Sequence, residues 1–460
     1  MTFDSPSARS SSAVLWSLVG GSPSLLDALT IDGPANVLPS MFDVTAFAAS
    51  AIGVASLAAS ELLAARTGTR ARPVKVDTIE AAAAFRSEAL FSPIGWERPP
   101  SWDPIAGDYR AADRWIRLHT NYASHRDAAL SVLGVAPERA AVEAAVARWE
   151  AARLESAVVE AGGCAATMYE RAEWLVHPHG AATTDEWPIT LDDDGPVDAS
   201  PLRVRGAARP LEGIRVLDLT RVIAGPVCTR FLAAHGADVL RIDPPGFEEV
   251  AALVPETTAG KRCVFLALDT RDGADRFDAL LERADVIVHG FRPGALERLG
   301  FGRERLRARN AGLVIARLDA YGWKGPWRDR RGFDSLVQMS CGIAAARGAE
   351  RPSPLPAQAL DHGVGYLLAA GVCRALARRA SEHRASTVRG ALLGTANHLF
   401  SLAPADPAAK VPSWPERIFE RTNTYWGDAL RVRCPGEIEG VPRPRLDRSA
   451  GPLGRDEATF

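Results

Sequence analysis

Apolar and polar positions follow two patterns in the second half of the chain. Short, nearly continuous apolar runs recur from residue 214 onward, separated by segments with helical spacing. Parallel strands that are covered on both faces carry such apolar runs. We therefore expect a parallel α/β sheet here. The expected strands are 214–219, 237–243, 263–268, 284–290 and 312–318, and the expected helices are 226–236, 272–283 and 294–300.

The first half of the chain has mainly helical spacing. Its most apolar segment, 44–66, is rich in Ala and Ser and reaches a charge at Glu61. A membrane span needs about 20 apolar residues, so a buried helix is the better interpretation. A long amphipathic helix is expected near 136–161, where Ala and Val recur among Glu and Arg.

An internal echo links the two halves, and a polar stretch separates them. Residues 55–85 and 369–399 both predict helix, basic turn, short strand and helix, which indicates a partial duplication. Residues 185–212 combine an acidic run with prolines and small residues, a composition typical of an exposed linker.

Composition narrows the class of protein. Of the 460 residues, 47% are hydrophobic and 24% are charged, as in globular proteins. The net charge of -2 gives no reason to expect nucleic acid or an anionic membrane as partner. The six cysteines form no CxxC pair or Cys/His cluster, so we expect neither a metal site nor a disulfide framework. That usage and the absence of a signal-peptide pattern favour a cytoplasmic protein.

Cationic residues recur at the expected strand ends and in loops. Each alone is typical of a solvated surface charge, but together they suit a ligand that carries phosphates. The loop 220–230 contains only Gly225, followed by Pro226, where a dinucleotide fold would carry G-x-G-x-x-G. A nicotinamide or flavin site is therefore disfavoured. The cationic residues are Arg241, Lys261, Arg262, Arg271, Arg292, Arg298 and Arg331.

Asp361 stands at the start of an expected apolar helix, just after a proline-containing loop. Residue chemistry alone favours a helix cap, although a carboxylate can also act as a covalent nucleophile. The two roles are compatible, because a helix N-terminus would keep the carboxylate ionised for attack. His289 and His362 are single histidines without a positioned partner, and no G-x-S-x-G elbow is present.

Several motifs together resemble the class III (CaiB/BaiF) CoA-transferase family. They are 211–246, 260–273, 284–327, 331–344 and the Asp361 segment, in the family's order and spacing over about 211–400. The resemblance implies a Rossmann-like parallel sheet domain with a smaller α+β domain. It also implies that Asp361 attacks an acyl-CoA and becomes an aspartyl-CoA thioester, from which an acceptor carboxylic acid takes the CoA. Asp334 matches a supporting acidic position.

The resemblance further implies a surface for CoA, which would be a substrate rather than a permanently bound cofactor. The cationic residues at the strand ends would then bind the phosphates of CoA. No metal is implied, and a homodimer is expected. The matching residues are Val222, Ile223, Ala224, Arg241, Leu268, Arg271, Gly290, Phe291, Arg298 and Arg331.

The chain departs from the family pattern in its order. The small-domain-like region precedes the first-half region, which predicts part of one copy fused to a second copy. In the first copy Ala48 matches Asp361, so one nucleophile is expected, with Asp43 as an alternative one turn earlier. The predicted divisions are a helical segment 1–95, a small-domain-like region 96–200, a CoA-binding domain 201–400 and a closing segment 401–460.

Two further functions stay open. A 2-methylacyl-CoA racemase of this family uses a histidine at the position of Phe333, so transfer is favoured over racemisation. A CoA-binding protein without catalysis is the other alternative, because of the rearranged order. The family's glycine-rich shielding loop has no counterpart in 345–357, and water exclusion protects a reactive anhydride.

Overall fold

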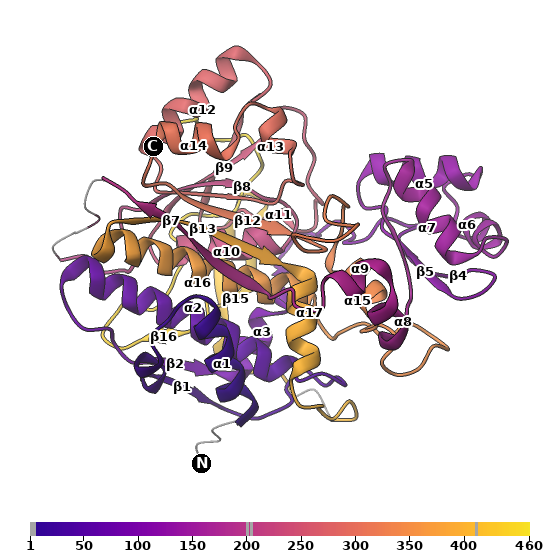
Figure 1. Cartoon of the computed structure of the whole chain (residues 1–460), viewed down its shortest axis with the longest axis horizontal. Coiled ribbons are helices and arrows are strands. Elements are labelled where there is room, and N and C mark those ends of the chain that lie inside the picture. Colours follow the sequence, from indigo (N-terminus) through magenta and orange to yellow (C-terminus); the bar gives the residue numbers. More distant parts are fainter. Residues whose placement is uncertain (1–5, 199–201, 203–205, 410–412) are drawn as a thin grey trace.

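The computed structural model describes residues 6–198, 202, 206–409 and 413–460. A seven-stranded sheet lies at its centre (Figure 1). Six strands run parallel and the edge strand β7 runs antiparallel to its neighbour β13, so the expected parallel α/β sheet is confirmed. In sheet order the strands are β10 (Lys261–Phe265), β9 (Asp238–Asp243), β8 (Arg215–Leu219), β11 (Val286–His289), β12 (Val314–Asp319), β13 (Arg384–Ala391) and β7 (Ile189–Pro196).

The strand order reverses between β8 and β11. Strand β8 is the first parallel strand in the chain; β9 and β10 are added on one side, and β11, β12 and β13 on the other. Connections that leave neighbouring strands in opposite directions open a crevice beyond their carboxyl ends, where ligands of such sheets bind. The loops after β8 and β11 therefore mark the expected position of a site.

Helices cover both faces of this sheet, as the apolar runs predict. Along β8, Val216 belongs to one hydrophobic cluster, whereas Leu217 and Leu219 belong to the cluster on the opposite face. The first face is covered by α10 (Ala224–Ala234), α16 (Ala359–Glu382) and α2 (Val44–Thr67). The second is covered by α12 (Arg271–Arg283), α13 (Ala295–Arg298) and α14 (Arg303–Arg309) (Figure 1).

Helix α2 packs against α16 along the centre of the protein. Among the described residues it is the one helix long and apolar enough to cross a membrane, but 94% of its apolar window is buried inside the protein. The buried Arg374 of α16 forms an ion pair with Glu61 of α2. The expectation of a buried helix at 44–66 is confirmed.

The two ends of the chain are interleaved in small sheets. One sheet pairs β1 (Leu29–Asp32) and β2 (Val74–Asp77) with β16 (Glu437–Ile438). The other pairs β14 (Phe419–Thr424) and β15 (Gly427–Val432) with β3 (Ser92–Pro93). The predicted helix, strand and helix order of the internal echo is also present. Its members are α2, β2 and α3 (Thr78–Ala84), and α16, β13 and α17 (Leu392–Ser401).

A separate lobe extends from the central sheet, on the right of Figure 1. The single helix predicted near 136–161 is wrong, because the chain turns between two shorter helices. The backbone N–H of Ala112 donates to the Trp149 carbonyl, and the Asp113 carboxylate accepts the Ala151 N–H at 2.8 Å, which starts the second helix. The lobe contains β4 (Gly107–Arg110), β5 (Trp115–Leu118), β6 (Ala165–Thr167), α5 (Ala123–Leu133), α6 (Arg139–Val146) and α7 (Ala151–Glu160).

The expected linker over 185–212 is wrong in its first part, which forms the edge strand β7. Its acidic run is held by arginines of neighbouring elements, with Asp192 paired to Arg389 and Asp193 to Arg384. The predicted division between residues 200 and 201 lies outside the described residues. The remaining elements are α1 (Pro6–Leu18), η1 (Pro23–Ala28), α4 (Ser87–Leu90), α8 (Arg171–Val176), α9 (Pro178–Ala182), α11 (Val254–Thr257), α15 (Asp334–Cys341) and η2 (Glu416–Ile418).

Candidate active site

A cavity of about 400 Å³ opens at the carboxyl edge of the central sheet. Val222 and Ile223, which follow β8, form part of its wall, and Asp334 and Asp361 line it together. Both predicted carboxylates therefore share one cavity with the loop at the strand-order switch. The N-terminal half of the chain contributes Arg86, Glu88, Trp102, Arg117, His119 and Asn121 to the same wall.

Asp361 lies in the first turn of α16, but it does not cap that helix. The cap comes from Asp334, the first residue of α15, whose carboxylate accepts the backbone N–H groups of Leu360 at 2.8 Å and Asp361 at 3.0 Å. The amide of Gln338 also donates to the Asp334 carboxylate. The capping interpretation of Asp361 is therefore wrong. A carboxylate 27 positions earlier in the chain satisfies these N–H groups, and Asp361 faces the cavity.

The environment of the two carboxyl groups favours their protonated forms. Burial raises the pKa of Asp361 well above its ordinary value, and the charges of Asp334 and Glu88 raise it further. Burial also raises the pKa of Asp334 to about 6, although the N–H groups it accepts oppose this shift. The expectation that the helix N-terminus keeps Asp361 ionised is thus wrong. The pair holds a proton more tightly than free carboxyl groups would.

Two glycines let α16 approach its neighbours at the site. A Cβ on Gly363 would lie 2.2 Å from the Phe47 ring of α2. A Cβ on Gly365 would lie 2.6 Å from the carbonyl oxygen of Ala224, the first residue of α10. The sequence D-H-G-V-G thus allows the Asp361 turn to pack tightly between α2 and the loop after β8.

The loop after β8 is held in a strained conformation by a buried acid. Val222 has a φ of 64°, which is unfavourable for a β-branched residue. Its backbone N–H donates to the Glu249 carboxylate at 3.0 Å, and the Tyr122 hydroxyl from the lobe donates to the other oxygen at 2.8 Å. Glu249 therefore joins the lobe to the candidate CoA loop.

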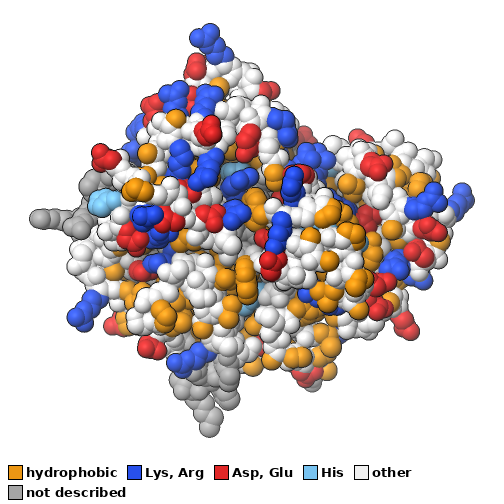
Figure 2. Space-filling model, viewed as in Figure 1, with side chains coloured by type: hydrophobic (Ala, Val, Ile, Leu, Met, Phe, Trp, Pro, Cys, Tyr) orange, Lys and Arg blue, Asp and Glu red, His pale blue; other side chains and the backbone are white. Residues whose placement is uncertain are grey.

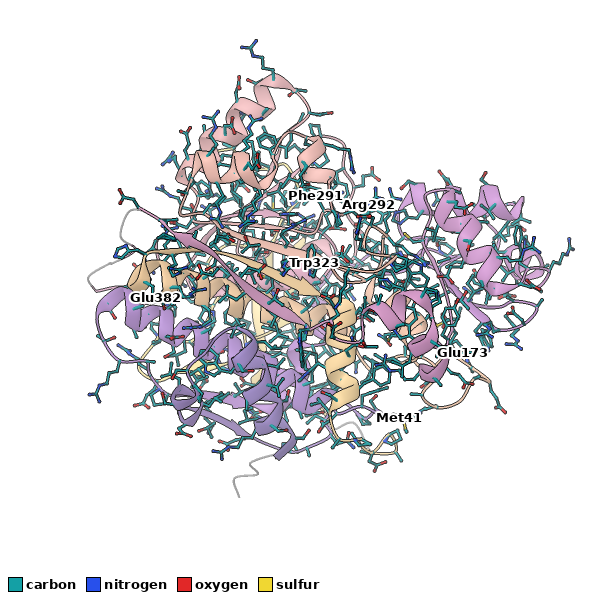
Figure 3. The ribbon with its side chains drawn as sticks, in the orientation of Figure 1. Met41, Glu173, Phe291, Arg292, Trp323 and Glu382 are labelled. Atoms are coloured by element: carbon teal, nitrogen blue, oxygen red, sulfur yellow. The ribbon has the colours of Figure 1, made fainter. Side chains whose placement is uncertain are left out.

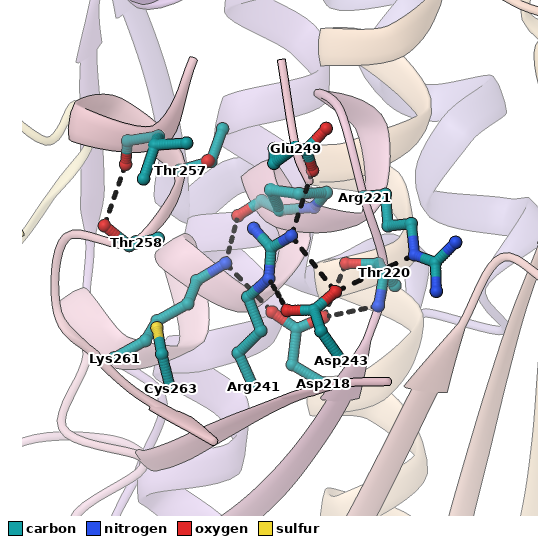
Figure 4. A network of polar contacts seen from close by, with 12 residues as sticks. Asp218, Thr220, Arg221, Arg241, Asp243, Glu249, Thr257, Thr258, Lys261 and Cys263 are labelled. Carbon is teal, nitrogen blue, oxygen red and sulfur yellow. Dashed lines mark hydrogen bonds and ion pairs between the residues drawn. The ribbon is translucent and has the colours of Figure 1, made fainter. Parts of the chain in front are cut away.

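Arg241 does not lie on the surface expected for a phosphate ligand. Its side chain is fully buried, 2.8 Å from Asp243 and 2.9 Å from Glu249, as Figure 4 shows. Despite the cost of burial, these carboxylates hold the pKa of Arg241 above its usual value. Lys261 and Asp218 form a second buried pair at 2.9 Å in the same network. In this structure Arg241 stabilises the fold of the loop rather than facing solvent.

The other residues of the expected CoA surface lie outside the cavity, along the same edge of the sheet. Gly290 and Phe291 follow β11, next to β8. Leu268 packs at the edge of a hydrophobic cluster. Arg271 starts α12 with 97% of its side chain exposed, and Ala224 starts α10.

A cationic group lies between this edge and the lobe. The charges of Arg331 and Arg298 add to partial burial in lowering the pKa of Arg292. Figure 3 shows Phe291 and Arg292 on the side of the sheet facing the lobe, and Arg331 donates to the Gly162 carbonyl of the lobe at 3.1 Å. On the face in Figure 2, Lys and Arg around α12 and α14 are interspersed with acidic groups.

Phe333 forms an aromatic contact that sequence analysis did not foresee. The His119 ring of the lobe stacks on it at 3.7 Å between centroids, with the ring planes 2° apart. Burial and the charge of Arg117 lower the pKa of His119 to about 3, so its imidazole is neutral and a weak base. The stack therefore supplies a flat wall rather than a proton acceptor.

The other candidate residues from the sequence are His362, His289 and Asp43. His362 Nε2 lies 2.9 Å from a carboxylate oxygen of Glu88, and the Phe85 ring stacks on the imidazole. Burial lowers the pKa of His289 to about 3. Asp43 caps α2 by accepting the Ala46 N–H at 2.9 Å and is not among the residues that line the cavity. Among the described residues, no cluster of three or more His, Cys, Asp or Glu could hold a metal ion.

Sequence analysis missed two parts of the cavity lining. They are the residues of the first half of the chain and the proline-rich segment after α15. No motif connects residues 86–121 with Asp361, and only the resemblance to a small domain at 108–134 could have indicated the lobe. A proline-rich segment that includes Pro352, Pro354 and Pro356 lines the cavity where a glycine-rich loop was expected in the family. The Leu355 N–H donates to the Gln338 side chain at 2.8 Å and holds this segment in place.

The match to a known family lies in the second half of the chain. Residues 211–423 match the model of CoA-transferase family III. The Mycobacterium tuberculosis protein named "Probable fatty acyl-CoA transferase Rv3272" is 34% identical over 204 residues, 41% of this chain and 52% of that protein. A formyl-CoA:oxalate CoA-transferase of Bradyrhizobium sp. is 32% identical over 198 residues, 40% of this chain and 46% of that protein.

A third relative and a solved structure cover similar shares. The succinyl-CoA–D-citramalate CoA-transferase of Chloroflexus aurantiacus is 35% identical over 157 residues, 31% of this chain and 39% of that protein. The crystal structure of Rv3272 is 35% identical with a TM-score of 0.40 and covers 42% of this chain and 56% of that one. The chain spans about half the length of the first of these relatives. Residues 211–423 of this chain, slightly less than half of it, are therefore similar to CoA-transferase family III.

Proposed function

We propose that this chain is a CoA-transferase that moves CoA from an acyl-CoA to a carboxylic acid, with Asp361 as the covalent nucleophile. The observation that carries the proposal is the position of Asp361. It lines a cavity shared with Val222 and Ile223, within the segment that matches the family. The names of three relatives, which describe CoA transfer on different acids, support the reaction class.

The proposed reaction begins with attack on the thioester. An Asp361 carboxylate oxygen attacks the acyl carbonyl, the C–S bond breaks, and a mixed anhydride and the CoA thiolate result. The thiolate attacks the Asp361 carbonyl of the anhydride, which releases the donor acid and leaves an aspartyl-CoA thioester. The acceptor carboxylate then repeats these steps in reverse order, and Asp361 is regenerated.

The raised pKa of Asp361 makes its ionised form a more reactive nucleophile, although a smaller fraction of the carboxyl group is then ionised. An ionised carboxylate with little solvation, beside Asp334, is a stronger nucleophile than one in water. Asp334 supports the proposed chemistry indirectly, because it caps α16 and so fixes the turn that carries Asp361. The stacked rings of His119 and Phe333 and the proline-rich segment would keep water from the anhydride.

Trapping of the covalent intermediate tests the proposal. The wild-type protein is incubated with a panel of acyl-CoA donors and hydroxylamine, then digested and analysed by mass spectrometry. We expect an Asp361 hydroxamate in the wild type. Asp361→Asn should lose the label and at least about 10³-fold of the transfer rate, as for other covalent nucleophiles. Asp43→Asn is the matched control and should retain both.

Other outcomes would support the other functions. Transfer with an unmodified Asp361 would contradict the mechanism. Exchange of the acyl α-proton for deuterium without transfer would indicate a racemase. Binding of CoA without turnover of any donor, unchanged in Asp361→Asn, would indicate a CoA-binding protein without catalysis.

A further inference from the structure

Arg86 lies in the turn between α3 and α4 and lines the cavity that contains Asp361. Its backbone is fixed on both sides. The N–H donates to the Ala83 carbonyl at 2.9 Å, and the carbonyl accepts the Leu90 N–H at 2.8 Å. The side chain therefore starts from a rigid turn of the N-terminal half of the chain.

This turn is also tied to the nucleophile's helix. Glu88, two residues after Arg86, lies 2.9 Å from Nε2 of His362, the residue that follows Asp361. Phe85, the residue before Arg86, stacks on the same imidazole with 5.5 Å between centroids. Phe85 and Glu88 thus both contact the first turn of α16. These contacts fix the position of the Arg86 backbone relative to Asp361.

Arg86 differs from the second guanidinium of the cavity wall in its partners. Arg117 is engaged, because it lies 2.6 Å from the Asp108 carboxylate and over the Trp102 ring. Within residues 6–198, 202, 206–409 and 413–460, the Arg86 side chain has no hydrogen bond, ion pair or ring contact. Among these residues it is the arginine of the cavity wall that is left for a ligand.

The chemistry of the proposed reaction requires such a cation. An acceptor acid arrives as an anion and must enter a buried space that already contains the Asp334 and Asp361 carboxyl groups. An unpaired anion there would be strongly disfavoured. A guanidinium offers two parallel N–H donors that match both oxygens of a carboxylate.

We propose that Arg86 binds the carboxylate of the acceptor acid and holds it against the Asp361 thioester; this inference rests on the proposed function. One carboxylate oxygen then forms a bond to the Asp361 carbonyl carbon while the C–S bond breaks and CoA leaves as the thiolate. The arginines Arg292, Arg298 and Arg331 do not line the cavity, so the CoA phosphates do not require Arg86.

A comparison of charged and neutral acceptors tests this role. Arg86→Gln is assayed with a carboxylic acid acceptor, and separately with hydroxylamine, a neutral nucleophile that needs no cation. We expect KM for the acid to rise about 10- to 100-fold, the usual effect of a lost charge-assisted hydrogen bond. The rate of hydroxylamine-dependent Asp361 labelling should stay within about twofold of the wild type.

Two further variants keep the test independent of folding. Arg86→Lys retains the positive charge but lacks the two parallel N–H donors of the guanidinium. It should bind the acid more tightly than Arg86→Gln and less tightly than the wild type. Arg70→Gln replaces an exposed arginine in the loop after α2 and should match the wild type in both assays. Circular dichroism verifies that each variant is folded.

The possible failures are distinguishable. An unchanged KM for the acid in Arg86→Gln, with labelling intact, would overturn the inference and leave the proposed function standing. A rise in KM for acyl-CoA with none for the acid would assign Arg86 to CoA and also overturn it. A wild type that neither labels Asp361 nor transfers CoA would overturn the proposed function, and the inference with it.

Discussion

At the residue scale, the two buried acids of the cavity divide the tasks that a single aspartate was expected to perform. Asp334 accepts the helix N–H groups, and Asp361 is left facing the cavity. This division has an electrostatic consequence for Asp361. Asp334 accepts the N–H groups at the start of α16, so these groups do not stabilise the Asp361 carboxylate. Burial and two neighbouring acids instead raise the pKa of Asp361.

The stability of Asp361→Asn should therefore depend on pH. An acid whose pKa is raised in the folded state destabilises the fold above its unfolded pKa of about 3.9, increasingly until the folded pKa is passed. Asn is neutral throughout. We expect the variant to unfold a few degrees above the wild type at pH 8, with the difference shrinking toward pH 4. Thermal melts followed by circular dichroism at both pH values measure this.

Asp77→Asn is the matched control for this pH dependence. Asp77 caps the short helix α3 by accepting the N–H groups of Ile79 and Glu80, away from the cavity. Its replacement should not raise the unfolding temperature at pH 8. A lower unfolding temperature for Asp361→Asn at pH 8 would contradict the assignment of a destabilising buried charge.

At the element scale, the site depends on how closely α16 approaches α10 and α2. The parallel strands could be predicted from apolar runs, but their order in the sheet and the contact between these helices could not. Gly363 and Gly365 allow this close approach, because a Cβ on either residue would lie 2.6 Å or less from an atom of a neighbouring helix. These two glycines, four and six residues after the start of α16, thus have a packing role at the site.

Gly365→Ala should weaken both folding and CoA binding. The new methyl group would meet the Ala224 carbonyl at 2.6 Å and Val227 at 2.8 Å, and would push the loop after β8. Overpacking of this kind costs about 1–3 kcal/mol, partly offset by alanine's better helix propensity. We expect a lower free energy of unfolding together with a raised KM for acyl-CoA, measured by urea denaturation and initial rates.

Gly371→Ala separates these two effects. Its methyl group would meet the Val388 side chain of β13 at 2.4 Å, further along the same helix and away from the loop. This variant should lose stability while its KM for acyl-CoA stays unchanged. Equal KM values in both glycine variants would show that contact with the loop does not control binding.

At the scale of the whole molecule, the two halves of the chain build one structure. Helix α2 of the first half packs on α16, and β3 of the first half pairs with β15 near the C-terminal end. The cavity has the same mixed origin, because Arg86 and His119 of the first half line it together with Asp361. The part of the chain that matches the family therefore lacks one wall of its site when taken alone.

Residues 211–460 expressed alone should not form a stable protein. Removal of the first half would expose the apolar face of α16 and the edge of β15, which favours aggregation. We expect no cooperative thermal transition, and recovery when residues 1–198 are co-expressed and co-purify. A soluble fragment that melts cooperatively at the temperature of the whole chain would contradict this.

The predictability of the fold and of the site differs for physical reasons. Strand and helix periodicity is local, so the parallel strands 214–219 and 284–290 were found from their own residues. The helix break after Val146 and the edge strand β7 could not be predicted in this way, because residues far away in the chain determine both. Asp113 starts α7, and arginines such as Arg389 neutralise the acidic strand.

The sequence by itself determined the parallel α/β sheet, the buried helix at 44–66 and the similarity of residues 211–423 to CoA-transferase family III. These depend on apolar periodicity and on motifs that are contiguous in the chain. Only the tertiary structure decided that Asp334 caps α16, that Arg241 is a buried ion-pair partner and that Arg86 lines the same cavity as Asp361. Each of these depends on which side chains fill the same space, and packing of distant segments fixes that.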